Sequence, residues 1–341
     1  MKIMVTGGAG YVGSTVSALL ADQGHQVVIV DNLCHATRDF VPEGVEFVEA
    51  DIADRTRLEG LFRRASDANV SFDGVLHFAA LIEAGESMKH PEVYFRNNTA
   101  STLALLEAIL AAGPKRFVFS STAAVYGEPE MVPIPETAGL RPTNAYGESK
   151  LLVEQMLSWF HRIHGLRSAS LRYFNVAGAA ESGEKGSGLI ARGEAHEPES
   201  HLIPLILDVA LGLRPAIKIF GDDYPTHDGT CVRDYIHVGD LADAHVLAFK
   251  ALETPAAGQA RLIYNLGNGA GFTVKEVIDS VRRVTGHPIP VEIHPRRPGD
   301  PAFLIASSEK AIAELGWKPR YSQIDEIIRT AWIWHQKRRG R

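Results

Sequence analysis

TGGAGYVGS, residues 6–14, is the stretch of sequence that decides the fold. It follows an apolar run at residues 2–5, precedes a helical pattern at residues 11–22, and contains both G-x-G-x-x-G and G-x-x-G-x-x-G spacings. Such a loop can turn tightly and bring its N–H groups and the N-terminus of the following helix against a pyrophosphate. The stretch therefore predicts a dinucleotide-binding βα unit, with a glycine turn that binds nothing as the alternative.

Short β-branched runs alternate with helical patterns through the first half of the chain. The runs predict strands at residues 2–5, 26–30, 45–48, 74–78, 116–120 and 167–171. The longer patterns predict helices at residues 11–22, 55–65, 91–112 and 146–164. Strands separated by helices imply right-handed βαβ units, so we expect an α/β protein with a Rossmann-type doubly wound parallel sheet.

The pattern changes after about Phe174. Residues 178–200, GAAESGEKGSGLIARGEAHEPES, are polar and rich in glycine, which predicts a binding loop or lid, with disorder as the alternative. A strand and helix at residues 234–252 then return to the first lobe, and a further helix is predicted at residues 274–285. We expect one domain of residues 1–176 with 234–268, and a smaller α/β C-terminal lobe of residues 177–233 and 269–341.

Charge and cysteine content exclude several kinds of partner and site. The net charge is −6 and the longest basic cluster is the terminal KRRGR, so we expect neither nucleic acid nor an anionic membrane as partner. Two cysteines, Cys34 and Cys231, are too few for a disulfide framework or a cysteine-rich zinc site. His161 and His164 have no cysteine or paired carboxylates nearby, so no metal is expected. Without a signal peptide or a run of about 18 apolar residues, a cytoplasmic enzyme or binding protein is expected.

The second predicted strand ends in a carboxylate that favours NAD as the dinucleotide. Asp31 follows Gly13 by eighteen residues, where it would hydrogen-bond the ribose diol of an adenosine. A carboxylate repels the 2′-phosphate of NADP, and Asn32 rather than an arginine follows it. Asp51 and Ile52, after the third strand, are candidates for the adenine edge, although an Asp after a strand is also a common helix cap.

The motif NAYGESK, residues 144–150, places Tyr146 and Lys150 on one helix face. A free tyrosine has a pKa near 10, and lowering it to about 7 requires roughly 4 kcal/mol. One positive charge about 4 Å away supplies that amount at an effective dielectric of about 20. Taken alone, Tyr-x-x-x-Lys is usually a solvated pair, but it follows a glycine loop and the serine-rich strand end FSSTAAVYG, residues 119–127. We therefore expect Lys150 to lower the pKa of Tyr146 so that it acts as a base.

Together, TGGAGYVGS, Asp31, SSTAAVYG and YGESK resemble the extended short-chain dehydrogenase/reductase superfamily. RYFNVAG at residues 172–178, FGDDYPTHDGTCVRDYIHVGDLADAH at residues 220–245 and PRRPGD at residues 295–300 are similar to its UDP-glucose 4-epimerases. The resemblance covers essentially the whole chain. It implies that the Rossmann domain holds NAD tightly, that the second lobe binds a uridine diphosphate sugar, and that UDP-glucose and UDP-galactose are interconverted.

The resemblance also implies roles for individual residues. Tyr146 as phenolate would take the proton of the sugar 4-hydroxyl while C4 passes a hydride to NAD, and Thr122 would hydrogen-bond the same oxygen; a strand-end cap is the alternative for Thr122. The 4-keto sugar would then turn and take the hydride back on its other face. The implied cofactor contacts are Gly7, Gly10, Tyr11, Val12, Gly13, Asp31, Asn32, Asp51, Ile52, Phe78, Ala79, Ala80, Asn98, Ser120, Tyr146, Lys150 and Tyr173.

On the substrate side, the resemblance assigns the diphosphate to two arginines and the ribose to one carboxylate. The implied substrate contacts are Thr122, Tyr146, Asn175, His201, Leu202, Phe220, Arg233, Arg297, Asp300 and Phe303. Taken singly, each arginine could be a surface ion-pair member, and Phe220 could be a core aromatic. Three positions depart from the family pattern: Ile82 replaces a common lysine, His201 an asparagine, and Phe303 a tyrosine. We expect bulky Phe303 to exclude N-acetylated sugars.

Other functions remain open at this point. A nucleotide-sugar 4,6-dehydratase needs an Asp-Glu pair after the catalytic threonine, where this chain has Ala123 and Ala124. Epimerases of UDP-N-acetylhexosamines, pentoses or uronic acids are further alternatives. A nonenzymatic NAD-binding regulator is another, although such proteins usually lose the Tyr or the Lys. Apolar positions at residues 99–110 and 151–160 exceed what one helix face needs. This predicts helices that pack against a second subunit in a homodimer, with residues of the protein's own core as the alternative.

Overall fold

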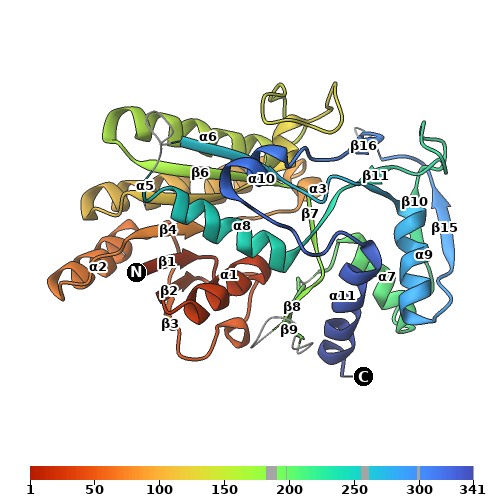
Figure 1. Ribbon diagram of the computed structural model, residues 1–341, viewed down its shortest axis with the longest axis horizontal. Coiled ribbons are helices and arrows are strands. Elements are labelled where there is room, and N and C mark those ends of the chain that lie inside the picture. Colours follow the sequence, from red (N-terminus) through yellow and green to blue (C-terminus); the bar gives the residue numbers. More distant parts are fainter. Residues whose placement is uncertain (182–189, 197, 255–260, 298–299, 341) are drawn as a thin grey trace.

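The computed structural model describes residues 1–181, 190–196, 198–254, 261–297 and 300–340 (Figure 1). Its centre is a seven-stranded parallel sheet with the order β13-β6-β5-β4-β1-β2-β3. The strands are β1 (Lys2–Thr6), β2 (Gln26–Asp31), β3 (Glu46–Glu49), β4 (Gly74–His77), β5 (Arg116–Thr122), β6 (Arg167–Tyr173) and β13 (Arg261–Leu266). This confirms the expected doubly wound sheet. The strand order reverses between β1 and β4, so a crevice opens there at the carboxyl ends of the strands.

Helices cover both faces of the sheet, which explains why its strands are apolar runs rather than alternating ones. On one face lie α1 (Tyr11–Asp22), α8 (Val238–Ala251) and α10 (Glu309–Leu315). On the other lie α2 (Arg55–Asp67), α5 (Ser101–Ala112) and α6 (Ala145–His164). Helix α6 begins where the Asn144 side chain accepts a hydrogen bond from Gly147 N, and it ends at Gly165, whose φ is 68°. Such caps fix where this helix starts and ends.

One expected helix is wrong in form. The pattern at residues 91–112 predicted one helix, but the structure contains α4 (Pro91–Tyr94), a π-helical segment (Phe95–Ala100) and then α5. Within the π-helical segment, the buried Asn98 amide bonds both N and O of Leu81, 17 residues away. A π-helical turn commonly marks a place where tertiary contacts override regular winding.

Most of the remaining elements build the second lobe around their own core (Figure 1), whereas the short helix α3 (Ala84–Ser87) packs against α6 of the first lobe. Its helices are α7 (Leu202–Ala210), α9 (Val274–Thr285) and α11 (Ile324–Arg338). Its paired strands are β7 (Asn175–Ala177) with β12 (Tyr235–His237), β10 (Ile217–Phe220) with β15 (Val291–His294), and β11 (Val232–Arg233) with β14 (Phe272–Thr273) and β16 (Phe303–Leu304). The glycine-rich stretch contributes the antiparallel pair β8 (Ala179–Glu181) and β9 (Ile190–Gly193), while residues 182–189 and 197 lie outside the described residues.

The C-terminal region is shared between the two cores. Ala311 of α10 and Trp317 pack in the core on the α1 and α8 face of the sheet, and Trp317 Nε1 donates to Asp240 O at 2.9 Å. This part of residues 269–341 therefore packs with the first lobe, which differs from the expected division. Among the helices that the structure describes, none combines the length and apolar character needed to cross a membrane.

Candidate active site

A cleft of about 1460 Å³ runs along the carboxyl edge of the sheet and into the second lobe. It brings together residues from both ends of the chain, and most of the residues predicted for cofactor and substrate lie on its wall. The predicted residues that line it are Gly7, Gly10, Tyr11, Val12, Gly13, Asp31, Asn32, Asp51, Ile52, Phe78, Ala79, Ala80, Ser120, Thr122, Tyr146, Lys150, Tyr173, Asn175, His201, Leu202, Phe220, Arg233, Arg297 and Asp300.

Two predicted residues do not line this cleft. Asn98 is only 2% exposed and hydrogen-bonds Leu81 and, at 3.0 Å, Ser149 Oγ, so it supports the wall from behind. Phe303 pairs with Val232, whereas the cleft-lining Arg233 pairs with the next residue of β16. Because paired residues point to the same face of a sheet, Phe303 faces away from Arg233. The expectation that Phe303 limits the size of the sugar pocket therefore has no support from its position.

The first loop requires glycine at different positions for two different physical reasons. Gly7 has a φ of 71°, and a Cβ there would lie 2.4 Å from Ala79 N; a Cβ on Gly13 would lie 2.2 Å from Gly7 O. Packing of the chain against itself therefore requires both. A Cβ on Gly10 would meet only Gly7 O at 3.4 Å and would project into the cleft. Close approach of a pyrophosphate to the backbone explains this third glycine, so the loop fits a dinucleotide.

The carboxylate at the end of β2 is fixed in place by backbone groups. Asp31 Oδ2 accepts from Ala9 N at 3.0 Å, and its Oδ1 accepts from Leu33 N at 2.9 Å. The side chain is 8% exposed and lines the cleft next to the glycine loop. Asp51 also lines the cleft, and its Oδ1 accepts from Ala53 N at 2.8 Å. The cap of the following helix α2 is Asp54 rather than Asp51, so the helix-cap alternative for Asp51 is wrong. The edge of β2 is thus negatively charged where a ribose diol would lie.

Helix α6 and the end of β5 converge on the candidate catalytic centre. Tyr146 and Lys150 lie one turn apart on α6, and Thr122 ends β5. Lys150 Nζ donates to Ser120 O at 2.9 Å and lies 6.0 Å from the centre of the Tyr146 ring. Thr122 Oγ1 accepts from Ala124 N at 3.1 Å, which leaves its O–H free to donate a hydrogen bond to Tyr146. The sequence-predicted trio therefore meets at one place, at the edge of the sheet.

The protonation of this trio differs from the sequence-based expectation. Burial raises the pKa of Tyr146 well above its usual value near 10, the neighbouring Tyr173 raises it further, and the hydrogen bond from Thr122 lowers it. Burial also lowers the pKa of Lys150 to about 7. In the protein chain by itself, burial therefore opposes the lowering of the Tyr146 pKa that was expected from Lys150, because desolvation disfavours the charged form of both groups.

A second phenol stands beside the first. Tyr173 Oη shares a very short hydrogen bond with Ser120 Oγ, and both side chains line the cleft. Burial raises the pKa of Tyr173 to about 12. The Tyr173 hydroxyl is thus engaged by Ser120 near Tyr146, which suits a binding role.

The opposite wall carries the cationic residues. Arg233 Nη2 forms a very short ion pair with Asp300 Oδ1, and the Arg297 guanidinium lies 4.0 Å from the centre of the Phe220 ring. Phe220 is therefore a partly exposed platform rather than a core aromatic. Guanidinium groups bind phosphate oxygens in a bidentate manner, so this wall suits a diphosphate.

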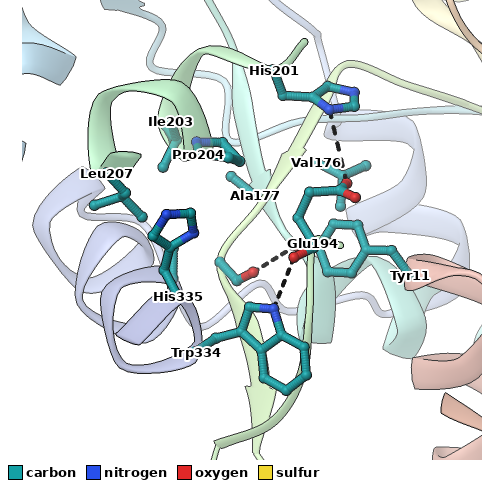
Figure 2. Close-up of a pocket in the computed structure, with 12 residues that line it drawn as sticks. Tyr11, Val176, Ala177, Glu194, His201, Ile203, Pro204, Leu207, Trp334 and His335 are labelled. Carbon is teal, nitrogen blue, oxygen red and sulfur yellow. Dashed lines mark hydrogen bonds and ion pairs between the residues drawn. The ribbon is translucent and has the colours of Figure 1, made fainter. Parts of the chain in front are cut away.

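His201, at the start of α7, faces the carboxylates of Glu194 and Glu199, of which Figure 2 shows Glu194. Its Nδ1 lies 2.8 Å from Glu199 Oε1 and 4.0 Å from Glu194 Oε2. Burial alone would lower the pKa of His201, but the hydrogen bond to Glu199 and the charge of Glu194 raise it to about 9. The Glu194 carbonyl in turn accepts from Trp334 Nε1 of α11 at 2.8 Å (Figure 2). His201 is therefore a cation at neutral pH on the rim of the cleft.

Sequence reasoning missed other residues that line the cleft. Ser200 Oγ donates to both carboxylate oxygens of Glu83 at 2.9 and 2.8 Å, and the rings of His35 and His196 stack with centres 5.3 Å apart. These pairs join the loops after β2 and β4 to the segment before α7. Ser200 and Glu83 are 117 residues apart, so no local spacing could have revealed their contact.

Comparison with known proteins matches this geometry. The model of the NAD dependent epimerase/dehydratase family matches residues 3–267. The chain is 53% identical over 334 residues to the UDP-glucose 4-epimerase of Streptomyces lividans, covering 98% of this chain and 96% of that one. It is 51% identical over 337 residues to the UDP-glucose 4-epimerase of Lacticaseibacillus casei, covering 98% and 97%.

Solved structures agree over the whole chain. A crystal structure of a UDP-glucose 4-epimerase superimposes with a TM-score of 0.92 and 48% identity, covering 100% of this chain and 99% of that one. The UDP-glucose 4-epimerase of Bifidobacterium longum, solved in complex with NAD⁺ and UDP, gives 0.88 and 37%, with coverage of 100% and 99%. From the glycine loop, the Tyr146 and Lys150 pair and these similarities together, the chain belongs to the NAD dependent epimerase/dehydratase family.

Proposed function

We propose that this protein interconverts UDP-galactose and UDP-glucose by removing the hydride from C4 of the sugar and returning it to the opposite face. The observation that carries the proposal is the convergence of Thr122, Tyr146 and Lys150 on one cleft with the glycine loop and the arginine wall. Relatives about half identical to this chain over nearly its full length bear the name UDP-glucose 4-epimerase.

Each residue of the centre has a task that its geometry supports. NAD, when bound, accepts a hydride at its nicotinamide and brings a positive charge in its oxidised form. Tyr146 takes the proton of the sugar 4-hydroxyl, and Thr122 donates a hydrogen bond that favours the phenolate. Lys150, held by Ser120 O, supplies positive charge to the same face of α6 when it is protonated. The residues that would hold NAD are those of the glycine loop, with Asp31 at the ribose.

The neighbours of Thr122 favour epimerisation over elimination. Ala123 is 7% exposed and Ala124 follows it in a short 3₁₀ helix, Ala123–Tyr126. Neither side chain can donate or accept a proton. A 4,6-dehydratase must remove a proton at C5 and protonate the leaving hydroxyl at C6, so this position lacks the groups that such a reaction uses.

The arginine wall supports a substrate that is bound through a nucleotide diphosphate. Arg233 and Arg297 line the part of the cleft formed by the second lobe, and Asp300 lines it too as the ion-pair partner of Arg233. Binding at the diphosphate leaves the sugar ring free to turn between the two hydride transfers. The large cleft gives the ring room to do so.

Conversion of UDP-galactose without added NAD tests the proposal. The purified protein is denatured in one aliquot to measure bound NAD, and a second aliquot is incubated with UDP-galactose while UDP-glucose is followed by chromatography. We expect conversion at full rate without added cofactor, and none by Tyr146→Phe. Protein that contains NAD and forms no UDP-glucose would contradict the proposal.

We also propose that the protein is a cytoplasmic homodimer. Leu103 and Leu110 of α5 are 38% and 39% exposed, and Trp159 and Ile163 of the neighbouring α6 are 59% and 67% exposed. Large apolar side chains gathered on adjacent helices mark an interface. The free thiols of Cys34 and Cys231 suit a reducing compartment. A monomer mass by light scattering at working concentration would contradict the dimer.

A further inference from the structure

Behind the catalytic centre lies an ion pair almost completely removed from solvent. Glu154 is 4% exposed and Arg172 is 1% exposed. Arg172 Nε donates to Glu154 Oε1 at 2.9 Å, and Arg172 Nη2 donates to Glu154 Oε2 at 2.5 Å. Ser121 Oγ completes the set with a 2.6 Å bond to Glu154 Oε1. One carboxylate of α6 is therefore tied to both β5 and β6.

The two strands are tied next to their catalytic residues. In the β5–β6 register, Ser121 pairs with Arg172, and the next pair is Thr122 with Tyr173. Side chains alternate between the faces of a strand, so Ser121 and Arg172 point to α6 while Thr122 and Tyr173 point into the cleft. A displacement of Ser121 or Arg172 along the sheet would move Thr122 and Tyr173 with it.

On α6, Glu154 is likewise connected to the residues of the catalytic centre. Tyr146, Lys150 and Glu154 follow one another at four-residue intervals on α6, so they share one face. Eight residues of helix place Glu154 about 12 Å along the axis from Tyr146. Within that distance, a rigid helix transmits the position of Glu154 to the phenol.

A second set of hydrogen bonds extends the network beyond the pair. Arg172 Nη1 donates to Tyr126 Oη at 2.9 Å, and Tyr126 Oη donates to Asn265 Oδ1 at 2.7 Å. Tyr126 ends the 3₁₀ helix that begins directly after Thr122, and Asn265 lies in β13. The network thus holds the chain on both sides of Thr122.

Stability alone does not explain why such a pair is buried. Taking two charges out of water costs several kcal/mol per ion, and replacing a buried pair by apolar residues of similar volume is often neutral or stabilising. We propose that Glu154 is a positioning residue, which holds Thr122 and Tyr146 at their working separation through Ser121 and Arg172. This inference rests on the proposed epimerase function.

Separate measurement of folding and turnover tests the role. The double variant Glu154→Leu/Arg172→Met removes both charges and keeps apolar volume, and it is compared with the parent as NAD-loaded protein. We expect a melting temperature at or above that of the parent. We also expect kcat for UDP-galactose to fall about 10- to 100-fold, as displacements near 1 Å produce, with KM within about threefold because the arginine wall is untouched.

Two further variants keep the test decisive. Ser121→Ala breaks the link from β5 to α6 while the ion pair persists; we expect a lower kcat at a nearly unchanged melting temperature and KM. The exposed pair Arg283–Asp325, at 2.6 Å, provides the matched control, and Arg283→Met/Asp325→Asn is expected to leave kcat unchanged.

Parental kcat in Ser121→Ala, or in a folded double variant, would overturn the positioning role. If the parent protein itself failed to convert UDP-galactose, the proposed function would fail instead, which separates the two results.

Discussion

Lys150 is expected to cost the protein stability at neutral pH, so that replacing it should stabilise the fold while abolishing catalysis. The side chain is 2% exposed, and burial lowers its pKa from 10.5 to about 7. The unfolded chain therefore binds more protons than the native chain between about pH 7 and pH 10.5. The contribution of Lys150 to the free energy of unfolding therefore rises with pH through that window. Below the window it is constant, because the folded and unfolded states both keep the proton.

The size of the effect follows from the difference between the two pKa values. At about 1.4 kcal/mol per pH unit, a fall from 10.5 to about 7 corresponds to roughly 5 kcal/mol. Lys150→Met also leaves Ser120 O without its 2.9 Å donor, which costs about 1–3 kcal/mol. We therefore expect the variant to be more stable by about 2–4 kcal/mol at pH 6 and less stable by about 1–3 kcal/mol at pH 10.5.

The measurement is urea unfolding of the parent and of Lys150→Met, both freed of NAD, at several pH values from 6 to 10.5. The difference in unfolding free energy between the parent and Lys150→Met should change by about 5 kcal/mol from pH 6 to pH 10.5. The lost hydrogen bond at Ser120 O does not alter this change, because its cost is the same at every pH. Replacing an exposed lysine, Lys318→Met, serves as the control for removal of one ammonium group from the surface. Parallel curves for the parent and Lys150→Met would refute the reasoning, because they would show that Lys150 has the same proton affinity in both states.

Three other outcomes follow from the site. Gly10→Ala should retain little NAD but, compared as NAD-free protein, should melt near the temperature of the parent, and equal NAD content in Gly10→Ala and the parent would contradict this. Gly7→Ala should lose stability in the same comparison because its Cβ would lie 2.4 Å from Ala79 N. Thr122→Val should lower kcat by about 10²- to 10³-fold. It should also move the acidic limb of the pH profile to higher pH, because the hydrogen bond from Thr122 lowers the pKa of Tyr146; an unmoved limb would argue against that bond. Trp159→Lys should shift the mass in light scattering from dimer to monomer, and an unchanged dimer would place the interface elsewhere.

Features with a local cause could be predicted from the sequence. The bounds of α1 and α9 match the predicted 11–22 and 274–285, since the apolar spacing lies within each segment and Thr273 caps α9 from the position directly before it. The glycine loop and the Tyr146 and Lys150 pair were found in the same way. Each is a short motif whose spacing carries its physical reason.

Features that depend on burial or on distant contacts could not be predicted. The amide of Asn98 bonds Leu81 from within a π-helical segment, and nothing in the local pattern at residues 91–112 marks that break. The pKa of Lys150 depends on how completely the fold excludes water. Likewise, only the β5–β6 register brings Ser121 beside Arg172 and so shows why Glu154 is buried.

Deuterium tracing at C4 tests the central claim most directly. UDP-galactose labelled with deuterium at C4 is incubated with the purified protein, without added NAD, and the UDP-glucose formed is examined by NMR. If Tyr146, Thr122 and Lys150 support removal and return of one hydride within the cleft, the product keeps the deuterium at C4. UDP-glucose that had lost the label to solvent, or label found at another carbon, would contradict the account.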